Sequence, residues 1–402
     1  MPKNNKNNKK RHKVVCFKDN NYELEYKIFN CDIKKMHPEI EIKRFQIINN
    51  IKNKLYQLLI NNIDNDNIRD NTKNLKQLSN EFIIRFIFLG ISENKNTVDP
   101  LFPFKFNNYV QIEKDINNII INNNNQEITN KILNELNLYN TFNKGIIEIK
   151  KFIKKNTFEI PEFKITSYFK NNIEYKKIWY KNSFIIINNL VEKKLREKFN
   201  GNLNFFDSIL WCLMFRYFII NDNNQLILNI HSDLEIYYNN YIELFASSIN
   251  SYKLFCSLFY DIEKYFKTFG NFFNIKIIKG FYKANMPYDE EIMKKTCIRL
   301  VNMLKKSSQP LSCLICMPVW DFKGKKIINS NLQNYDYGKY EALEVLENSD
   351  LITFKKILSK NQINYLSINN MKKIPASNTY IIVIENKFSN LDFNYLNKFN
   401  FL

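Results

Sequence analysis

Apolar residues in the first half of the chain recur at steps of three and four, the spacing of one face of a helix. The clearest example is the set Phe45, Ile48, Ile51, Leu55 and Leu58. Residues 78–89 and 128–138 follow the same spacing, whereas Asp99 to Pro103 and the asparagine run 122–125 are typical of loops. We therefore predict a mainly helical domain over residues 15–190, after a basic, disordered tail at 1–14.

Beyond residue 191 the pattern changes to short apolar runs that alternate with longer amphipathic segments. After an apolar helix at 205–218, strands are predicted at 241–245, 275–278, 311–317 and 380–384, and helices at 289–304, 340–347 and 352–358. Alternating strands and helices favour an α/β domain over residues 191–402, with a doubly wound, parallel sheet in three layers.

The strongest chemical signal lies between the second of these strands and the helix after it, in Ala284-Asn285-Met286-Pro287-Tyr288. The N6 amine of adenine is a poor nucleophile because its lone pair is delocalised into the ring. The Asn285 side-chain oxygen and the Met286 carbonyl are acceptors for its two N–H groups, and Tyr288 is a ring on which the base can stack. The segment is equally typical of an ordinary turn in which Pro287 ends the strand.

Charge favours a polyanionic partner. Lys and Arg number 59 against 40 Asp and Glu, a net charge of +19. The richness in Asn, Ile and Lys is also typical of an A/T-rich genome, which raises lysine content without selection for binding. The lysines at 150, 151, 154, 155, 176 and 177 are candidates for an RNA path, or a solvated face.

Other classes of site and compartment receive no support from the sequence. Seven cysteines without framework spacing are typical of reduced, intracellular thiols, and Cys313 and Cys316 lie in an apolar run that predicts buried strand cysteines. Three scattered histidines indicate no metal site. The basic N-terminus is unlike a signal peptide. The apolar stretch 208–220, interrupted by Arg216, is predicted to be too short for a membrane span, so we expect a soluble protein.

Several motifs around residues 284–288 occur in the order of a known family. Phe245-Ala246-Ser247-Ser248-Ile249-Asn250 stands where that family has Phe-Ala-Ser-Pro-Leu-Asn, and 284–288 where it has Ala-Asn-Pro-Pro-Phe. Further matches are Phe255-Cys256-Ser257, Tyr265-Phe266, Glu290-Glu291, Pro310-Leu311-Ser312, Pro318-Val319-Trp320 and Ser377-Asn378-Thr379. Over about residues 191–386 the chain resembles the cap-specific adenosine N6-methyltransferases related to the phosphorylated-CTD-interacting factor. It departs from them at Met286, where the family has its first proline, and at Tyr288, where it has phenylalanine.

The resemblance implies a Rossmann-like methyltransferase domain that uses S-adenosylmethionine. Its substrate would be capped mRNA starting with adenosine, methylated at N6 of the 2′-O-methyladenosine beside the cap. The catalytic residues implied are Asn285, Met286, Pro287 and Tyr288, and those for the cofactor are Ala246, Ser247, Asn250 and Asp261. Asp261 and Glu263 are candidates for the ribose hydroxyls, although acids on a helix surface are an equal interpretation.

Two other functions stay open. Met286 frees a backbone dihedral and adds an N–H, which motivates a catalytically inactive homologue that binds the cap or RNA. An N6-adenine DNA methyltransferase would use the same chemistry. The three tryptophans, at 179, 211 and 320, are too far apart for a WW module, so binding to the polymerase tail is not implied. Family resemblance favours the nucleus, or the cytoplasm for a viral protein, and no membrane partner is expected.

Overall fold

The computed structural model describes the chain in segments. These are residues 13–28, 36–63, 75–93, 99–102, 113, 116–117, 125–221, 226–230, 241–251, 253–320, 327–329, 332–335, 340–360, 362–367 and 372–389. Most of the predicted basic tail and of the asparagine run at 122–125 lies outside them.

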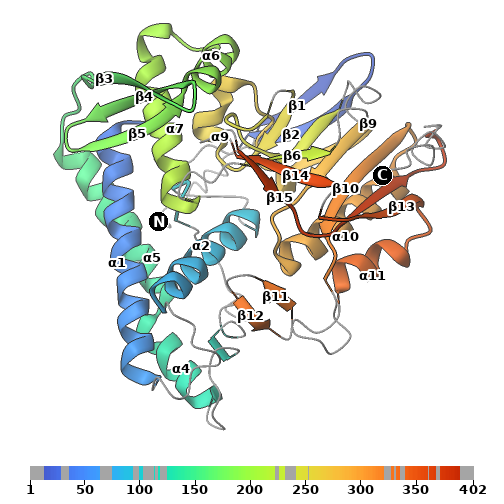
Figure 1. Ribbon diagram of the computed structural model, residues 1–402, viewed down its shortest axis with the longest axis horizontal. Coiled ribbons are helices and arrows are strands. Elements are labelled where there is room, and N and C mark those ends of the chain that lie inside the picture. Colours follow the sequence, from blue (N-terminus) through green and yellow to red (C-terminus); the bar gives the residue numbers. More distant parts are fainter. Residues whose placement is uncertain are drawn as a thin grey trace, which may run out of the picture.

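Helices form one side of the molecule (Figure 1). They are α1 (Pro38–Asn62), α2 (Leu75–Glu93), α4 (Asn125–Leu136) and α5 (Leu138–Lys155), and α1 packs against the other three. Ile48, Ile51 and Leu55 are buried, which confirms the predicted face of α1. At the start of α1 the His37 side chain accepts a hydrogen bond from the Glu39 N–H, and Pro38 takes the first turn, where a missing donor costs nothing.

The central helix of this core is α7 (Phe206–Asn221), in which Leu210, Trp211 and Leu213 are fully buried. Together with the short turn before it, the segment Leu203–Ile220 is long and apolar enough to cross a membrane, and 67% of it is buried inside the protein. Length alone therefore does not exclude a span, contrary to the sequence prediction. Its burial is typical of a core helix.

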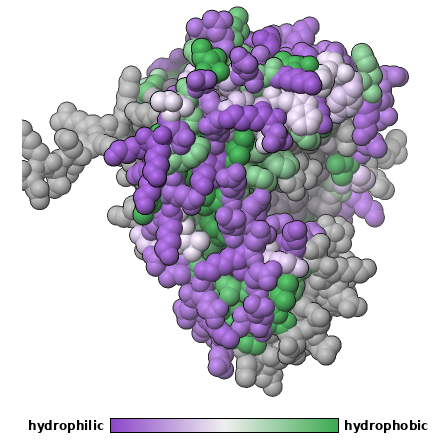
Figure 2. Space-filling model, turned by 90° about the vertical axis from the view of Figure 1, so that its left-hand side faces the viewer, coloured by the Kyte–Doolittle hydropathy of each residue, from purple (hydrophilic) through white to green (hydrophobic). Residues whose placement is uncertain are grey.

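Three antiparallel strands that the sequence did not predict pack on α7. They are β3 (Lys164–Lys170), β4 (Ile173–Tyr180) and β5 (Ser183–Asn188). Ile178 and Ile185 face the core, and the Trp211 Nε1–H donates to the Ile178 carbonyl at 3.2 Å. Helix α6 (Asn189–Lys198) follows directly. On the side where α1 lies in Figure 1, the surface is mostly hydrophilic with separate apolar patches (Figure 2).

The main sheet has the strand order β8-β7-β9-β10-β16-β13. Its strands are β7 (Ile242–Ala246), β8 (Phe255–Ser257), β9 (Ile275–Asn285), β10 (Leu311–Pro318), β13 (Ile352–Leu358) and β16 (Thr379–Glu385). The first four are parallel, and β16 runs antiparallel to both of its neighbours. The sheet is therefore mixed, not wholly parallel as predicted.

An N-terminal hairpin extends this sheet. Strands β1 (Lys13–Lys18) and β2 (Glu23–Ile28) pair with each other, and β2 pairs antiparallel with the first half of β9, Glu23 opposite Lys279. Gly280 follows, with φ +116°, and a Cβ there would lie 2.4 Å from Cδ1 of Tyr22. A side chain at 280 would therefore disrupt the hairpin's contact with the sheet.

The predicted helix at 352–358 is wrong, because this segment forms strand β13. Its exposure alternates residue by residue, with Ile352, Phe354 and Leu358 turned inward. A period of two is the strand period, and β-branched and aromatic residues fit a pleated surface better than a helix.

The two faces of the sheet carry different covers. Helices α10 (Glu290–Lys306) and α11 (Glu341–Glu347) cover one face. A small antiparallel sheet covers the other, made of β6 (Leu226–Ile230), β14 (Ile363–Ser367) and β15 (Lys373–Pro375). Cys313 and Cys316 are both fully buried, and they belong to the cores on opposite faces. The prediction of buried strand cysteines is confirmed.

The remaining elements are all short. These are the short helix α9 (Tyr260–Glu263) and the hairpin β11 (Ile327–Asn329) with β12 (Leu332–Tyr335), and three single 3₁₀ turns lie at 203–205, 264–266 and 272–274. Across the described segments, no group of His, Cys, Asp and Glu is arranged to hold a metal ion.

Candidate active site

The order of the strands places a switch point between β7 and β9. From β7 the chain moves to β8 on one side, then returns to β9 on the other side of β7. In open α/β sheets ligands bind at the carboxyl ends of the strands where the order reverses. Those ends are Ala246 and Asn285, and a cavity of about 490 Å³ lies there.

Seven of the eight predicted site residues line this one cavity. They are Ala246, Ser247, Asn250, Asn285, Met286, Pro287 and Tyr288. The two motifs are 35 or more positions apart in sequence, and the parallel pairing of β7 with β9 brings them together. A volume of this size suits a small molecule or one nucleotide.

Asn285 carries a notable polar atom. It is the last residue of β9, and its side-chain Oδ1 is buried with no hydrogen-bond partner among the residues that the structure describes. A buried carbonyl oxygen without a donor costs about 1–3 kcal/mol, so native proteins keep few of them. The oxygen is thus an acceptor available to a donor that enters from outside the protein.

The residues after Asn285 are fixed by their own contacts. Met286 is 2% exposed and packs in the core beneath α10. Asp289 caps that helix, its Oδ1 accepting from the Ile292 N–H at 3.0 Å, while its other oxygen pairs with Arg85 of α2. This is the usual N-cap geometry, here at a helix that begins a few residues after a strand ends.

Tyr288 stands at the open side of the cavity and is 38% exposed. Its hydroxyl lies 2.5 Å from the Tyr365 hydroxyl of β14, and both residues line the cavity. Burial raises the pKa of the Tyr288 hydroxyl, so it is neutral at physiological pH. The bond to Tyr365 restrains the hydroxyl end of the ring, and the ring itself is part of the cavity lining.

The loop after β7, residues 247–251, is held by hydrogen bonds between its own residues. The Asn250 Oδ1 accepts from the Ser247 N–H at 2.7 Å and from the Ser247 hydroxyl at 3.0 Å. Ser251 N–H donates to the Ser247 carbonyl at 2.9 Å, one turn further on. The Asn250 side chain therefore shapes the loop.

Glu263 anchors this loop from behind. Its carboxylate accepts from the Ser248 N–H at 2.7 Å, the Ser248 hydroxyl at 3.1 Å, the Tyr217 hydroxyl at 3.0 Å and the Phe259 N–H at 3.2 Å. Burial raises the pKa of Glu263, and these hydrogen bonds oppose the rise. Glu263 serves the loop, and it does not line the cavity.

Lysines of α6 hold the same loop from another side. Lys194 Nζ donates to the Ile249 carbonyl, and Lys198 Nζ donates to the Ser251 carbonyl at 2.8 Å. Burial, with the charge of Lys198 as a smaller cause, lowers the pKa of Lys194 to about 7. Burial likewise lowers the pKa of Lys198 to about 8. The loop is thus clamped by α6 and by Glu263.

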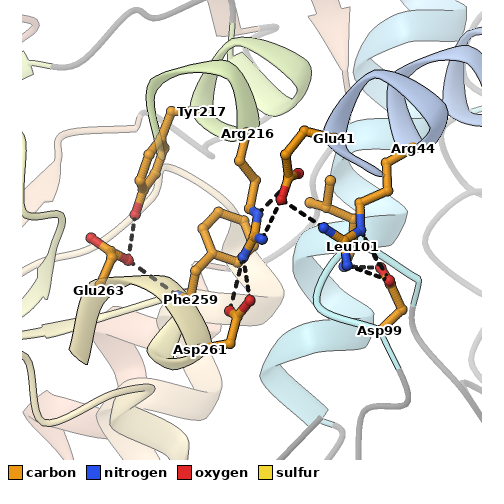
Figure 3. Close-up of polar contacts among 9 residues, drawn as sticks. All are labelled: Glu41, Arg44, Asp99, Leu101, Arg216, Tyr217, Phe259, Asp261 and Glu263. Carbon is orange, nitrogen blue, oxygen red and sulfur yellow. Dashed lines mark hydrogen bonds and ion pairs between the residues drawn. The ribbon is translucent and has the colours of Figure 1, made fainter. Parts of the chain in front are cut away.

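Asp261 is the one predicted site residue that the structure does not bring to the cavity. Both of its oxygens accept from Arg216 Nη1 at 2.8 Å. Figure 3 shows the buried chain to which this pair belongs, running through Glu41 and Arg44 to Asp99. Next to Arg216 in α7, Tyr217 reaches Glu263, so the ion network adjoins the loop anchor.

Sequence reasoning missed most of the cavity wall. Phe88 of α2, Tyr217, Phe245, Phe272, Phe273 and Tyr365 all line it. In a chain with 15% aromatic residues no local pattern distinguishes these from core aromatics.

The family match includes both motifs. Residues 187–353 match the family model described as "Phosphorylated CTD interacting factor 1 WW domain". The match covers 167 of the 402 residues, and over this part the chain is similar to the family.

Two relatives are named mRNA (2'-O-methyladenosine-N(6)-)-methyltransferase, one from Mus musculus and one from Homo sapiens. Each is 28% identical over 121 residues, which are 28% of this chain and 17% of the relative. The chain thus spans less than a fifth of the length of the curated relatives it matches. The family match supports a methyltransferase function. The residues at the carboxyl ends of β7 and β9 are the ones on which that function would depend.

Proposed function

We propose that the protein is an S-adenosylmethionine-dependent methyltransferase that acts on N6 of the 2′-O-methyladenosine beside the cap of mRNA. The observation that carries the proposal is the buried, unpartnered Oδ1 of Asn285 at the end of β9, in the cavity at the switch point. The named relatives have the matching activity in their names.

The order of the main sheet supports a Rossmann-like reading of the domain. In its parallel part, the chain adds β8 on one side of β7 and then β9 on the other side. Doubly wound folds bind their ligands where the strand order reverses in this way. The antiparallel β16 and the small sheet over one face are additions to that core.

The residues at the end of β7 fit a nucleoside-type cofactor. Small side chains at Ala246 and Ser247 allow close approach to the backbone without a glycine turn, and Asn250 and Glu263 hold that backbone in shape. S-adenosylmethionine supplies the methyl group as an electrophile when it is bound. The protein's part is to hold the loop, orient the substrate amine and exclude water.

Asn285 acts on the amine. An adenine N–H donated to Oδ1 satisfies the unpartnered oxygen and draws the nitrogen towards tetrahedral geometry, which localises its lone pair. The Met286 carbonyl is the second acceptor that we assign. Pro287 favours an extended backbone at the residue before it, which is Met286 here. The same restriction would act on the proline that stands at this position in the family that the chain resembles.

Tyr288 holds the base. Its ring stands at the open side of the cavity, and the bond to Tyr365 limits its rotation. A base stacked on an aromatic ring is stabilised by about 1–3 kcal/mol, and positioning accounts for much of the rate in such transfers.

The test is methyl transfer to a panel of substrates, read by nucleoside mass spectrometry. The purified protein and S-adenosylmethionine are incubated with capped RNA that begins with 2′-O-methyladenosine. Matched samples carry uncapped RNA, capped RNA beginning with guanosine, or single-stranded DNA. We expect N6-methylated product only from the first.

Each alternative has its own outcome in the same panel. Product from uncapped DNA would replace the proposal with a DNA methyltransferase. RNA binding without product from any substrate would replace it with an inactive homologue, and Met286→Pro would then be the variant to assay for restored activity.

A further inference from the structure

A second and larger cavity lies along α10, outside the candidate active site. It has a volume of about 1120 Å³ and runs between the start of β9 and the C-terminal two-thirds of α10. We call it the α10 groove. Its volume is above the usual range for a single small molecule, which is about 300–1000 Å³.

The α10 groove is lined by cations. Lys276, Lys295, Arg299 and Lys306 line it, and none of the described residues in its lining is acidic. Two acids stand beside it. Glu25 lies 3.5 Å from Lys276 and Glu291 lies 3.1 Å from Lys295, both as partly exposed pairs that are worth little. The groove therefore keeps a positive potential that attracts anions.

Arg299 adds an independent observation. Its Nε is buried and has no acceptor within the described residues, while its Nη2 donates to the Ile275 carbonyl. Its guanidinium lies 5.7 Å from the centre of the Phe272 ring, which lines the candidate active site. A buried N–H without an acceptor is rare, and a planar guanidinium is well matched to phosphate.

The two cavities share a wall. Phe273 lines both of them, so the groove begins where the candidate active site ends. Ile292 lines the active-site cavity and Lys306 lines the groove, 14 positions apart on α10. At 1.5 Å per residue this is about 21 Å, or about six nucleotides of a strand that rises 3.4 Å per nucleotide.

We propose that the α10 groove binds the phosphates of single-stranded RNA, in the stretch that follows the nucleotide held at Asn285. The choice of RNA rests on the proposed function, whereas the charge, the unpartnered Arg299 Nε and the shared wall are features of the groove itself. The groove selects for length. A capped dinucleotide reaches only the active-site end, and a strand of 12 nucleotides reaches both ends.

The first measurement is binding without methyl donor. Fluorescence anisotropy with a capped 12-nucleotide RNA gives Kd between 50 and 300 mM salt for the wild type and for Lys276→Gln/Lys306→Gln. Both lysines are exposed, so the fold is not at risk. We expect weaker binding and a slope of log Kd against log salt that is smaller by about 1.4, because each phosphate contact on a single strand contributes about 0.7.

The matched control is Lys131→Gln/Lys144→Gln, which removes the same charge from exposed positions on α4 and α5. Its slope should equal that of the wild type. A groove variant whose slope also equals the wild-type slope would overturn the proposal. Equal losses in both variants would overturn it as well, because net charge would then explain the effect.

The second measurement is the ratio of kcat/KM for the 12-nucleotide RNA to kcat/KM for the capped dinucleotide. We expect the groove variant to lose the preference for the longer substrate and the control to keep it. The two proposals fail separately. If no RNA is methylated but the salt slope falls only in the groove variant, the groove stands and the proposed reaction does not.

Discussion

At the scale of single residues, the candidate site depends on one side chain that is poorly satisfied in the free protein. Within the described part of the chain Asn285 Oδ1 has no donor, and its burial has a cost that a bound amine would remove. Binding sites often keep such groups at the expense of stability, because a ligand satisfies them later.

Asn285→Ala separates these two effects. We expect single-turnover methyl transfer to fall by a hundredfold or more, about 3 kcal/mol of transition-state stabilisation. The midpoint of thermal unfolding should not fall, because Oδ1 makes no hydrogen bond that the variant could lose. Tyr288→Phe is the control in the same cavity. It keeps the ring and removes the hydroxyl with its bond to Tyr365, so its rate should stay within about threefold of the wild type. If Asn285→Ala transferred methyl groups at the wild-type rate, residues 284–288 would be an ordinary turn with no catalytic role.

The sequence revealed those site residues that are contiguous. The site could be predicted at Asn285 to Tyr288 because the end of a strand, a proline and a helix cap follow one another within a few positions. Asp261 and Glu263 look alike in sequence, both being acids of one short helix, yet Arg216 takes the first and the loop after β7 takes the second. Only tertiary structure decides between such neighbours, because their partners lie tens of positions away.

At the scale of elements, strands with strong patterns were predictable, and weak or short ones were not. Four strands of the main sheet were found because each contains a short apolar run, and the clearest is β10, where every residue is buried. Strand β8 has three residues, too few for a pattern, and β3 is exposed along its whole length. In β13 the lysines at 355 and 356 interrupt the alternation that would have marked a strand.

The clamp of α6 on the loop after β7 leads to a prediction about pH. Burial lowers the pKa of Lys194 from 10.5 to about 7, so in this window the unfolded state binds the proton that the folded state has lost. Stability due to this group is therefore fully present above pH 10.5 and is lost as pH falls to about 7.

Lys194→Met removes that dependence. Measured by urea denaturation, the free energy of unfolding of the wild type should rise relative to this variant by about 2 kcal/mol between pH 7 and pH 9. Lys193→Met, at the exposed neighbouring position, should follow the wild type across the range. Parallel curves for the wild type and Lys194→Met would show that the lysine is not desolvated as the structure has it.

At the scale of the whole molecule, the helical side and the sheet are joined through buried charge. Arg216 of α7 donates to Glu41 of α1 and to Asp261 of α9, and all three side chains are largely withdrawn from water (Figure 3). Removing one member leaves the others charged and buried, which costs about 3–5 kcal/mol.

We expect Arg216→Met to lower the free energy of unfolding by that amount, and Arg196→Met to lower it by less than about 1 kcal/mol. The second arginine is itself exposed, so water screens its pair with Asp207, and its other partner, the buried Glu192, keeps an ion pair with Lys176. Chemical denaturation of both variants measures the difference. Equal, small effects would mean that the buried chain of charges is not a structural joint.

The pairing of β2 with β9 also has a consequence for synthesis. Glu23 meets Lys279 only after 256 further residues have been made. At about 5–20 residues per second, the ribosome needs roughly 13 to 50 s to supply that partner. Throughout this interval the N-terminal hairpin presents an open strand edge, which is the kind of surface that other chains pair with and that chaperones cover. The first-made strands can therefore join the sheet only after Lys279 has been made, and the ribosome sets the time at which this pairing can begin.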